Sequence, residues 1–541
     1  MARALLVVLC ALLALPVLAV LASWLSFDSA ALDILRHQAS TVLPGYAGQS
    51  LLLALGVGLG VALLGGATAA AVSLFQFPGR RFFEWALLLP LAMPAYVLAY
   101  AATDFLQFSG PLQNALRDLS GATGPLWPDV RSLPGAIVLF TLALYPYVYL
   151  LTRGALLERG LHLMEAARLL GAGLGRRVRE VALPLARPAI AAGVALALME
   201  TLADYGVGAY FGLTTFTTGI YKAWLVMDDK TAAAQIASVL LAAVAALLWL
   251  ERRAQARLRF ASSRAGALHA AESRPLPLRG AAAGSALLLC ALPILLGFVV
   301  PVLVLLQLLW QEARHNELGL PLARFAQWSL TSLKLAGLAA LLAVLLALVL
   351  AYLGRVNRSG GAGRGMLLQA SSRVVGLGYA VPGAVIAIGI LLPLGWMQER
   401  LPGLGLPALL TGTILGLLYA YLVRFSGVAL QSLEAGYARI SPTVDETARM
   451  LGASRVRLFL ELHAPLLARS AWAASLLVFV DVMKELPATL VLRPFNSDTL
   501  AVVAYQLARD ERLGEEALPS LAIVLVGLIP VIMLSRAMRR S

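Results

Sequence analysis

Long apolar runs separated by short polar loops occupy the chain from one end to the other. A helix needs about 20 apolar residues to cross a bilayer, and twelve stretches of this chain approach or exceed that length. We predict spans near residues 4–24, 47–75, 82–105, 133–153, 188–206, 229–250, 282–310, 329–354, 374–396, 408–427, 470–490 and 517–537. The first run is expected to be an uncleaved span and not a signal peptide, because no polar domain follows it. The pattern therefore predicts an all-α polytopic membrane protein with twelve transmembrane helices.

The twelve predicted spans form two related sets of six. The motif Ala167–Ala172, ARLLGA, returns at Ala448–Ala453 as ARMLGA, 281 residues further along the chain. Upstream, Met93–Val97 resembles Val381–Val385. Because each set contains an even number of spans, both sets have the same orientation in the membrane. We therefore expect two parallel six-helix repeats related by a pseudo-twofold axis along the membrane normal, an arrangement in which transporters pass substrate at the repeat interface.

One basic, polar stretch separates the two sets of spans. It is rich in arginine, contains serine and proline, and lacks the apolar length needed to cross a bilayer. The predicted domains are a first six-span repeat at 1–250, a basic cytoplasmic linker at 251–280 and a second six-span repeat at 281–541.

Composition and charge agree with a membrane protein. Hydrophobic residues make up 60% of the 541 residues and charged residues only 13%, about half of the share that a soluble domain carries. The formal net charge of +14 does not indicate nucleic-acid binding, because the arginines lie in short loops between apolar runs. Lys and Arg accumulate in this way on the cytoplasmic side of membrane proteins, and their distribution places both termini in the cytoplasm.

Each half has one longer loop between its fourth and fifth spans, and these two loops share a motif. In both copies a glutamate is followed six residues later by a glycine, and the glycine thirteen residues later by a proline. The spacing predicts a short amphipathic helix, a glycine turn with positive φ and a second short helix. A simple helix cap in an ordinary interfacial loop is the alternative, and identical spacing in two copies argues against it. The candidate residues are Glu165, Ala166, Ala167 and Gly171 in the first copy and Glu446, Thr447, Ala448 and Gly452 in the second.

This pattern of Glu-Ala-Ala, Gly and Leu-Pro resembles the cytoplasmic loop of binding-protein-dependent importers of the ATP-binding-cassette type. In that family the loop forms coupling helices that dock on two ATPase subunits, so the resemblance implies such docking for Glu165–Gly171 and Glu446–Gly452. Thr447 departs from the usual alanine but is still a small residue. The resemblance extends over nearly the whole chain, since each half looks like one six-span permease unit. It implies a multi-pass protein of the bacterial inner membrane.

Four acidic residues fall inside predicted spans, where charges are costly and mark functional candidates. Glu200 and Asp204 are four residues apart in the fifth span, and Asp481 and Glu485 are four apart in the eleventh, so each pair shares a helix face. The repeat axis is expected to bring all four around a central path, and carboxylates suit a hard cation. Alternatively, Lys484 pairs with one acid, and the others cap helices or face the water outside. Helix ends near 205–206 or 486–487 would put Asp204 and Glu485 at the membrane interface.

The surroundings of these acids resemble the fused permeases of ferric-iron importers. The resemblance is carried by Glu200–Gly206, ETLADYG, with Tyr210–Gly212 after it, and by Lys484–Thr489, KELPAT, with Asp510–Arg512 after it. It implies that a periplasmic iron-binding protein delivers Fe³⁺ to this chain. Thiamine, polyamine and phosphonate permeases share the general architecture, so these substrates remain alternatives.

Motifs of several other functions are missing from the sequence. It contains no GxxxxGK[ST] phosphate loop, so we expect that the chain is not an enzyme, binds no cofactor itself and leaves ATP and Mg²⁺ to partner ATPases. Cys10 and Cys290 lie in apolar runs without metal-ligand spacing, and no metal site is assigned. The five histidines are scattered and are expected to face solvent: His37, His162, His269, His315 and His463.

Two rival classes of function explain less of the sequence. An ion-coupled secondary transporter with parallel six-span repeats accounts for the acids in the spans but not for the duplicated loop. A membrane-embedded enzyme needs a converging cluster of His, Cys or acids beyond these four carboxylates. The sequence therefore favours the permease subunit of an ATP-driven importer.

Overall fold

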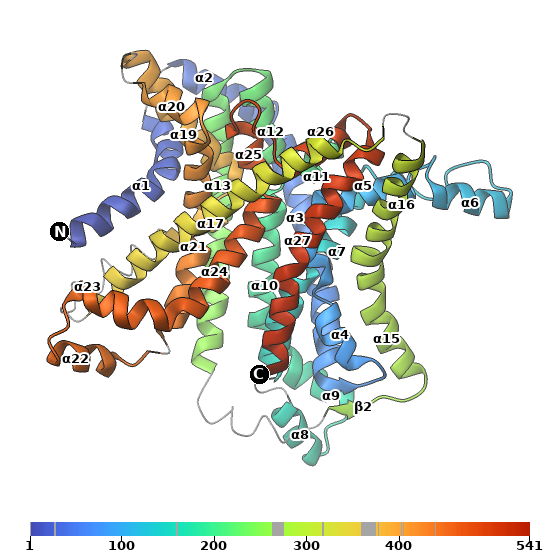
Figure 1. The fold of residues 1–541 in the computed structure, drawn as a ribbon. Coiled ribbons are helices and arrows are strands. Elements are labelled where there is room, and N and C mark those ends of the chain that lie inside the picture. The colour runs from blue at the N-terminus through green and yellow to red at the C-terminus, as the bar shows by residue number, and fades with distance from the viewer. Residues whose placement is uncertain are drawn as a thin grey trace. The chain divides into compact units, whose positions relative to one another are not determined.

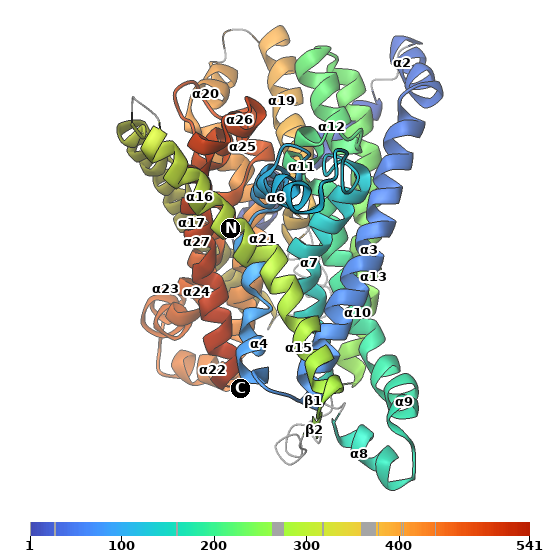
Figure 2. The same cartoon turned by 90° about the vertical axis from the view of Figure 1, so that its right-hand side faces the viewer.

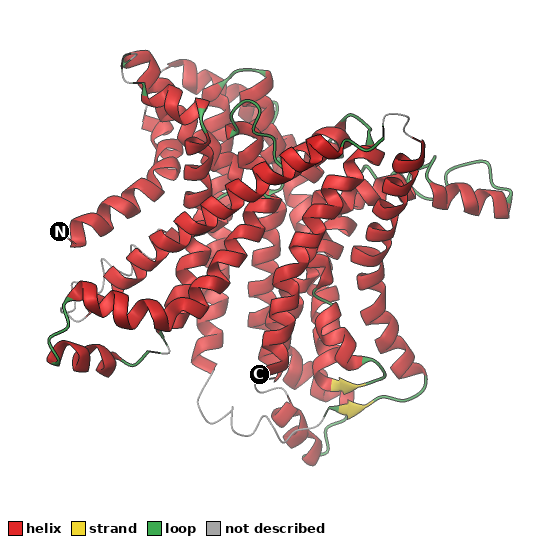
Figure 3. Ribbon diagram, viewed as in Figure 1, coloured by secondary structure: helices red, strands yellow, loops and turns green. Residues whose placement is uncertain are grey.

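The computed structural model describes residues 2–540 apart from 26–28, 158–160, 262–274, 316–318, 359–374, 377, 402, 404 and 439. Across the described residues the chain is helical, with one pair of two-residue parallel strands in which Phe75 pairs with Leu276 and Gln76 with Pro277 (Figure 3). The confirmed fold class is therefore an all-α polytopic membrane protein.

The elements follow one another as shown in Figure 1. In chain order they are α1 (Ala2–Ala22), η1 (Ser23–Leu25), α2 (Ser29–Ser40), α3 (Leu43–Leu74), β1 (Phe75–Gln76), α4 (Arg80–Ala86), η2 (Leu89–Ala92), α5 (Ala95–Leu106), α6 (Pro111–Ser120), α7 (Leu133–Ala155), α8 (Leu161–Leu169), α9 (Leu174–Arg177), η4 (Val178–Ala182), α10 (Leu183–Ala203), α11 (Gly206–Tyr210), α12 (Phe216–Tyr221), η5 (Lys222–Val226), α13 (Lys230–Ala261), β2 (Leu276–Pro277), α15 (Ala281–Ile294), η6 (Leu295–Val299), α16 (Val300–His315), α17 (Leu322–Arg358), η7 (Gly378–Ala380), α19 (Gly383–Arg400), α20 (Leu406–Gly412), α21 (Ile414–Tyr437), α22 (Pro442–Met450), α23 (Arg455–Arg457), η8 (Leu458–His463), α24 (Ala464–Lys484), α25 (Pro487–Leu492), α26 (Leu500–Arg509) and α27 (Leu513–Arg540).

Ten helices of the described chain are long and apolar enough to cross a membrane, and they match ten of the twelve predicted spans. The third predicted span is a helix pair, 80–92 and 95–120, bent by 92°. The ninth corresponds to α19, which begins only after Pro382 and ends in polar residues. The number of twelve crossings therefore stays a prediction.

In both of these departures a proline begins the helix after a short 3₁₀ turn. Pro94 follows η2 and precedes α5, and Pro382 follows η7 and precedes α19. Their backbone angles are nearly the same, φ −59° and ψ 144° for Pro94 and φ −55° and ψ 139° for Pro382. Proline lacks the N–H that would continue a preceding helix, so each apolar stretch is interrupted at this residue.

Packing divides the chain into two compact units that both take helices from each predicted repeat. The first unit comprises 1–38, 220–241 and 322–503, and the second comprises 39–219, 242–321 and 504–541. The predicted domain ranges rest on sequence similarity and stay a prediction. Residues 262–274 of the predicted linker lie outside the described residues, and α13 continues through its first eleven residues.

Each unit has a core of three long helices, which derive from the second, fourth and fifth predicted spans of one repeat. In the second unit α3, α7 and α10 pack against one another, and in the first unit α17, α21 and α24 do so. Glycines make the close approach of α7 possible. A Cβ at Gly65 would lie 2.7 Å from the carbonyl oxygen of Tyr145, and one at Gly193 would lie 2.6 Å from the Cα of Val148. Small residues at helix crossings are the usual means of packing helices within a membrane.

Candidate functional site

Two short helical segments carry the duplicated motif. The first motif segment comprises α8 and α9, residues 161–177, and lies beyond the end of α10 (Figure 2). The second motif segment comprises α22 and α23, residues 442–457, and precedes η8 and α24 (Figure 1). Both therefore have the helix, turn and helix arrangement that the spacing predicts.

The two turns have the same backbone geometry. Gly171 has φ +82° and Gly452 has φ +81°, both in the left-handed region. In the first turn the N–H of Gly171 donates to Arg168 at 2.9 Å and that of Ala172 to Ala167 at 3.0 Å. In the second turn Gly452 donates to Arg449 at 3.0 Å and Ala453 to Ala448 at 3.0 Å. Glycine adopts this conformation without the steric cost that a Cβ would bring, and the helix ends where it does for this reason.

The motif residues lie on the surface of each unit. Glu165, Ala166 and Gly171 are exposed and Ala167 is half-buried. In the second segment Glu446, Thr447 and Gly452 are exposed and Ala448 is half-buried. The hydroxyl of Thr447 donates to the carbonyl of Thr443 at 2.9 Å within its own helix, so the departure from alanine leaves the helix intact.

Two adjacent apolar side chains project at the end of each first helix. Leu169 and Leu170 are 85% and 87% exposed, and Met450 and Leu451, 281 residues later, are 88% and 82% exposed. Large apolar side chains that are this exposed next to a polar rim favour contact with another protein. The same position in both segments makes these four residues the most accessible apolar contacts of the motif.

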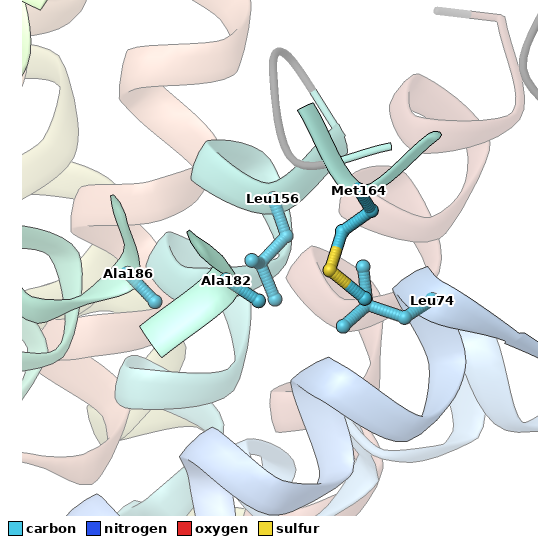
Figure 4. Packing of buried hydrophobic residues seen from close by; sticks show 5 residues of the cluster. All are labelled: Leu74, Leu156, Met164, Ala182 and Ala186. Atoms are coloured by element: carbon cyan, nitrogen blue, oxygen red, sulfur yellow. The ribbon is translucent and has the colours of Figure 1, made fainter. Parts of the chain in front are cut away.

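Different chemistry attaches each motif segment to its unit. Under the first, Met164 packs with Leu74, Leu156, Ala182 and Ala186 in a buried apolar cluster (Figure 4). Such an attachment rests on the removal of apolar surface from water and has no directional component.

Under the second segment the attachment is polar. The Arg355 guanidinium donates to the Asp445 carboxylate, with Nε 2.7 Å from Oδ2, and His463 Nε2 lies 3.0 Å from Oδ1 of the same group. Burial by itself would raise the pKa of Asp445, but the hydrogen bonds from Arg355 and His463 outweigh it, so this pKa lies below its ordinary value. The carboxylate is therefore held in its charged form.

The expectation that all the histidines face solvent is wrong for His463. Its side chain is fully buried between Asp445 and Tyr437, and its Nδ1 lies 3.2 Å from the Tyr437 hydroxyl. The sequence gives no signal for this burial: Arg355 stands at the end of a long apolar run, where an arginine commonly extends its charge to the membrane interface.

The acids of the fifth span lie at the end of α10. Glu200 is half-buried one turn before this end. The helix stops at Ala203, and Asp204 adopts an extended backbone with φ −71° and ψ 132°. The Asp204 carboxylate accepts a hydrogen bond from the N–H of Val207 at 2.8 Å. Asp204 therefore caps α11, as the alternative interpretation of these acids predicts.

Glu485 has the same position after α24 and a denser set of partners. Its carboxylate accepts hydrogen bonds from the N–H groups of Ala488 and Thr489, both at 2.9 Å, and from the Thr489 hydroxyl. The Arg424 guanidinium lies 3.3 Å away, and the Glu485 side chain is only 1% exposed. Gly383 leaves room for this pair, since a Cβ there would lie 2.6 Å from both charged groups. Glu485 is therefore a buried helix cap with a largely buried cationic partner.

The predicted convergence of the four acids around one path stays a prediction. Glu200 and Asp204 belong to the second unit, whereas Asp481 and Glu485 belong to the first. Asp481 is half-buried one turn before the end of α24. Within the described residues no group of three or more His, Cys, Asp or Glu side chains is arranged to hold a metal ion.

Comparison with known proteins places these features in a family. The model of the "binding-protein-dependent transport system inner membrane component" matches residues 62–260. The "Fe(3+)-transport system permease protein FbpB 2" of Haemophilus influenzae is 25% identical over 491 residues, which cover 90% of this chain and 88% of that protein.

Two shorter relatives match about a third of the chain. The "Molybdenum transport system permease protein ModB" of Escherichia coli is 30% identical over 34% of this chain and 81% of its own length. The "Putative 2-aminoethylphosphonate transport system permease protein PhnU" of Salmonella choleraesuis is 28% identical over 37% of this chain and 70% of its own length. With this coverage, and with its membrane-spanning helices, the chain belongs to the family of binding-protein-dependent transport system inner membrane components.

Proposed function

We propose that this permease translocates ferric iron delivered by a periplasmic binding protein, and that separate ATPase subunits drive it by docking on the two motif segments. The observation that carries the coupling part is the pair of segments with the same glycine turn and the same exposed apolar ends. The similarity to an Fe(3+)-transport permease over 90% of the chain supports the substrate. The chain itself is not an enzyme in this proposal, and the partner ATPases use ATP and Mg²⁺.

The proposed cycle begins when ATP binding closes the two ATPase subunits. Their movement displaces the two motif segments. Each segment contains a turn at a glycine with positive φ, Gly171 in the first and Gly452 in the second. The six-span halves then open toward the periplasm, and the loaded binding protein releases its ion into the path. Hydrolysis resets the inward-open state. Both termini lie in the cytoplasm in this arrangement, since arginine-rich loops favour that side.

Acids near the helix breaks are proposed to line the cation path. Asp204 and Glu485 cap the helices that follow them, Glu200 and Asp481 lie one turn earlier, and all four acids are candidates for this path. Oxygen ligands suit a hard cation such as Fe³⁺.

Removal of the charges of Glu200 and Asp481 is expected to slow cation passage. We expect Glu200→Gln combined with Asp481→Asn to reduce iron uptake at least about tenfold, because intramembrane carboxylates on an ion pathway are functional charges. Uptake into vesicles, normalised to the amount of inserted permease, measures this effect. Glu180→Gln, at an exposed residue with an i,i+4 ion pair, is the matched control. Unchanged uptake kinetics in the double variant would return both acids to structural roles.

Vesicle transport tests the proposal as a whole. The chain is co-expressed with a candidate ATPase and binding protein, and the uptake of radiolabelled ferric iron is followed with and without ATP. ATP-dependent uptake of iron is the expected result. ATP hydrolysis stimulated by binding protein without iron movement would keep the importer but exclude iron, leaving phosphonate, molybdate, thiamine or polyamine to be assayed in the same vesicles. Uptake that ignores ATP would instead favour an ion-coupled secondary transporter.

The phosphonate alternative has its own support. The alignment with the phosphonate permease relative covers 70% of that protein's length, although only 37% of this chain. Competition by 2-aminoethylphosphonate for ATP-dependent uptake separates this alternative from iron, since the compound is not expected to reduce uptake by an iron carrier.

A further inference from the structure

Four positions under the first motif segment carry apolar side chains, and the corresponding positions under the second segment carry polar ones. The apolar set is buried beneath the first segment, and each of its members has a counterpart 281 residues further along, beneath the second segment. The apolar residues are Leu74, Leu156, Met164 and Ala182, and their counterparts, in the same order, are Arg355, Tyr437, Asp445 and His463. For Leu156, Met164 and Ala182 the offset equals that of the Glu and Gly motif, which lies in the same part of each repeat. Leu74 lies at the end of α3 and Arg355 near the end of α17, the corresponding helix, so all four exchanges concern corresponding places.

Arg355 is the centre of the polar set. Besides the Asp445 carboxylate, its guanidinium donates to the carbonyl oxygens of Tyr437 at 3.2 Å, Ile440 at 3.0 Å and Ser441 at 3.1 Å. These carbonyls belong to the end of α21 and to the turn that leads into α22. A guanidinium presents five N–H donors in a rigid fork, which a lysine ammonium cannot reproduce. Arg355, from α17, therefore holds both the turn and the helix that follows it.

The remaining polar groups of the set are also hydrogen-bonded. His463 joins the Asp445 carboxylate to the Tyr437 hydroxyl, and no side-chain nitrogen or oxygen of these four residues is among the buried atoms that lack a hydrogen-bond partner in the described chain. A buried network in which every group is satisfied specifies one arrangement, whereas apolar contacts allow sliding and repacking. The second motif segment is therefore held by a network of directional bonds, whereas the first is held mainly by apolar packing, beside one hydrogen bond of 3.5 Å from Arg177 to the Met164 carbonyl.

We propose that Arg355, Asp445 and His463 form an ionic anchor that makes the second motif segment move as one body with α17, α21 and α24, while the first segment is free to shift on its apolar cluster. Arg355 and Asp445 are then positioning residues for coupling. The role in coupling rests on the proposed function, whereas the anchor itself does not. The two halves of the permease accordingly respond to their ATPase subunits with different stiffness.

Hydrogen–deuterium exchange of the full chain in nanodiscs tests the anchor without any partner. In the variants Arg355→Lys and Asp445→Asn we expect the amides of 442–450 to exchange at least about tenfold faster than in the unchanged protein, because the local opening of α22 becomes easier. The amides of 161–169 should be unaffected. Met164→Leu, which conserves volume in the apolar cluster, is the matched control. Unchanged exchange at 442–450 in both variants would overturn the anchor.

A transplant of the apolar set separates positioning from simple stabilisation. The variant carries Arg355→Leu, Tyr437→Leu, Asp445→Met and His463→Ala, and therefore repeats the first attachment under the second segment. We expect normal insertion of this variant into the membrane. In the complete transporter the substrate moved per ATP hydrolysed should fall at least about threefold, because on apolar packing the second motif segment no longer moves as one body with α17, α21 and α24. If the variant moves as much substrate per ATP hydrolysed as the unchanged transporter, the anchor only stabilises the fold. If the unchanged transporter shows no ATP dependence, the proposed function fails, and the exchange experiment still decides on the anchor.

Discussion

Proline at both motif glycines is expected to abolish ATP-driven uptake while leaving the permease in the membrane. Gly171 and Gly452 have φ +82° and +81°, and proline is restricted to φ near −65°, so neither turn can form in the double variant. A Cβ at either glycine would meet nothing within 4 Å, so the effect arises from the backbone alone. The measurements are membrane content by immunoblotting and ATP-dependent uptake into vesicles.

Asparagine at the same two positions is the matched control. Asparagine tolerates the left-handed region far better than other residues with a Cβ, so we expect uptake within a few-fold of the unchanged protein. Undiminished uptake in the proline variant would remove the motif turns from the coupling mechanism. Loss of the proline variant from the membrane would show instead that the turns are needed for folding, and the single proline variants would then locate the defect.

Removal of the Glu485 carboxylate is expected to have the largest effect on stability. Glu485→Ala deprives two backbone N–H groups of their acceptor and leaves the Arg424 charge without its carboxylate. Breaking a buried ion pair on one side costs about 3–5 kcal/mol, which is a large part of the stability of a typical domain. Thermal unfolding of the purified permease, followed by tryptophan fluorescence, should show a much lower midpoint and a reduced folded yield.

Two further variants identify the source of this loss. Arg424→Met combined with Glu485→Ala should be more stable than Glu485→Ala alone, because the unpaired buried cation is gone. Asp204→Asn should change the stability by no more than about 0.5 kcal/mol, since asparagine caps a helix about as well as aspartate. If the double variant unfolds as readily as the single one, the ion pair is not what stabilises this helix break.

The sequence by itself determined the membrane class, most of the helices and the two motif segments. Apolar runs of span length and a glycine at a fixed distance from a glutamate are local features, and local physics decides them. A bilayer requires helices of about 20 residues, and a left-handed turn strongly favours glycine. The ends of α10 and α24 were likewise among the alternatives, because Gly206 and Pro487 favour a break between helices, and each is the first residue of the helix that follows.

Only the tertiary structure decided which distant residues meet. The apolar helix surfaces are too alike to specify their partners, so the sequence did not reveal that each compact unit combines helices of both repeats. The pairing of Glu485 with Arg424, 61 residues away, and of Asp445 with Arg355, 90 residues away, depends on how α17, α21 and α24 pack. The prediction for His463 was wrong for the same reason: the sequence places it between the tenth and eleventh predicted spans, whereas packing buries it completely.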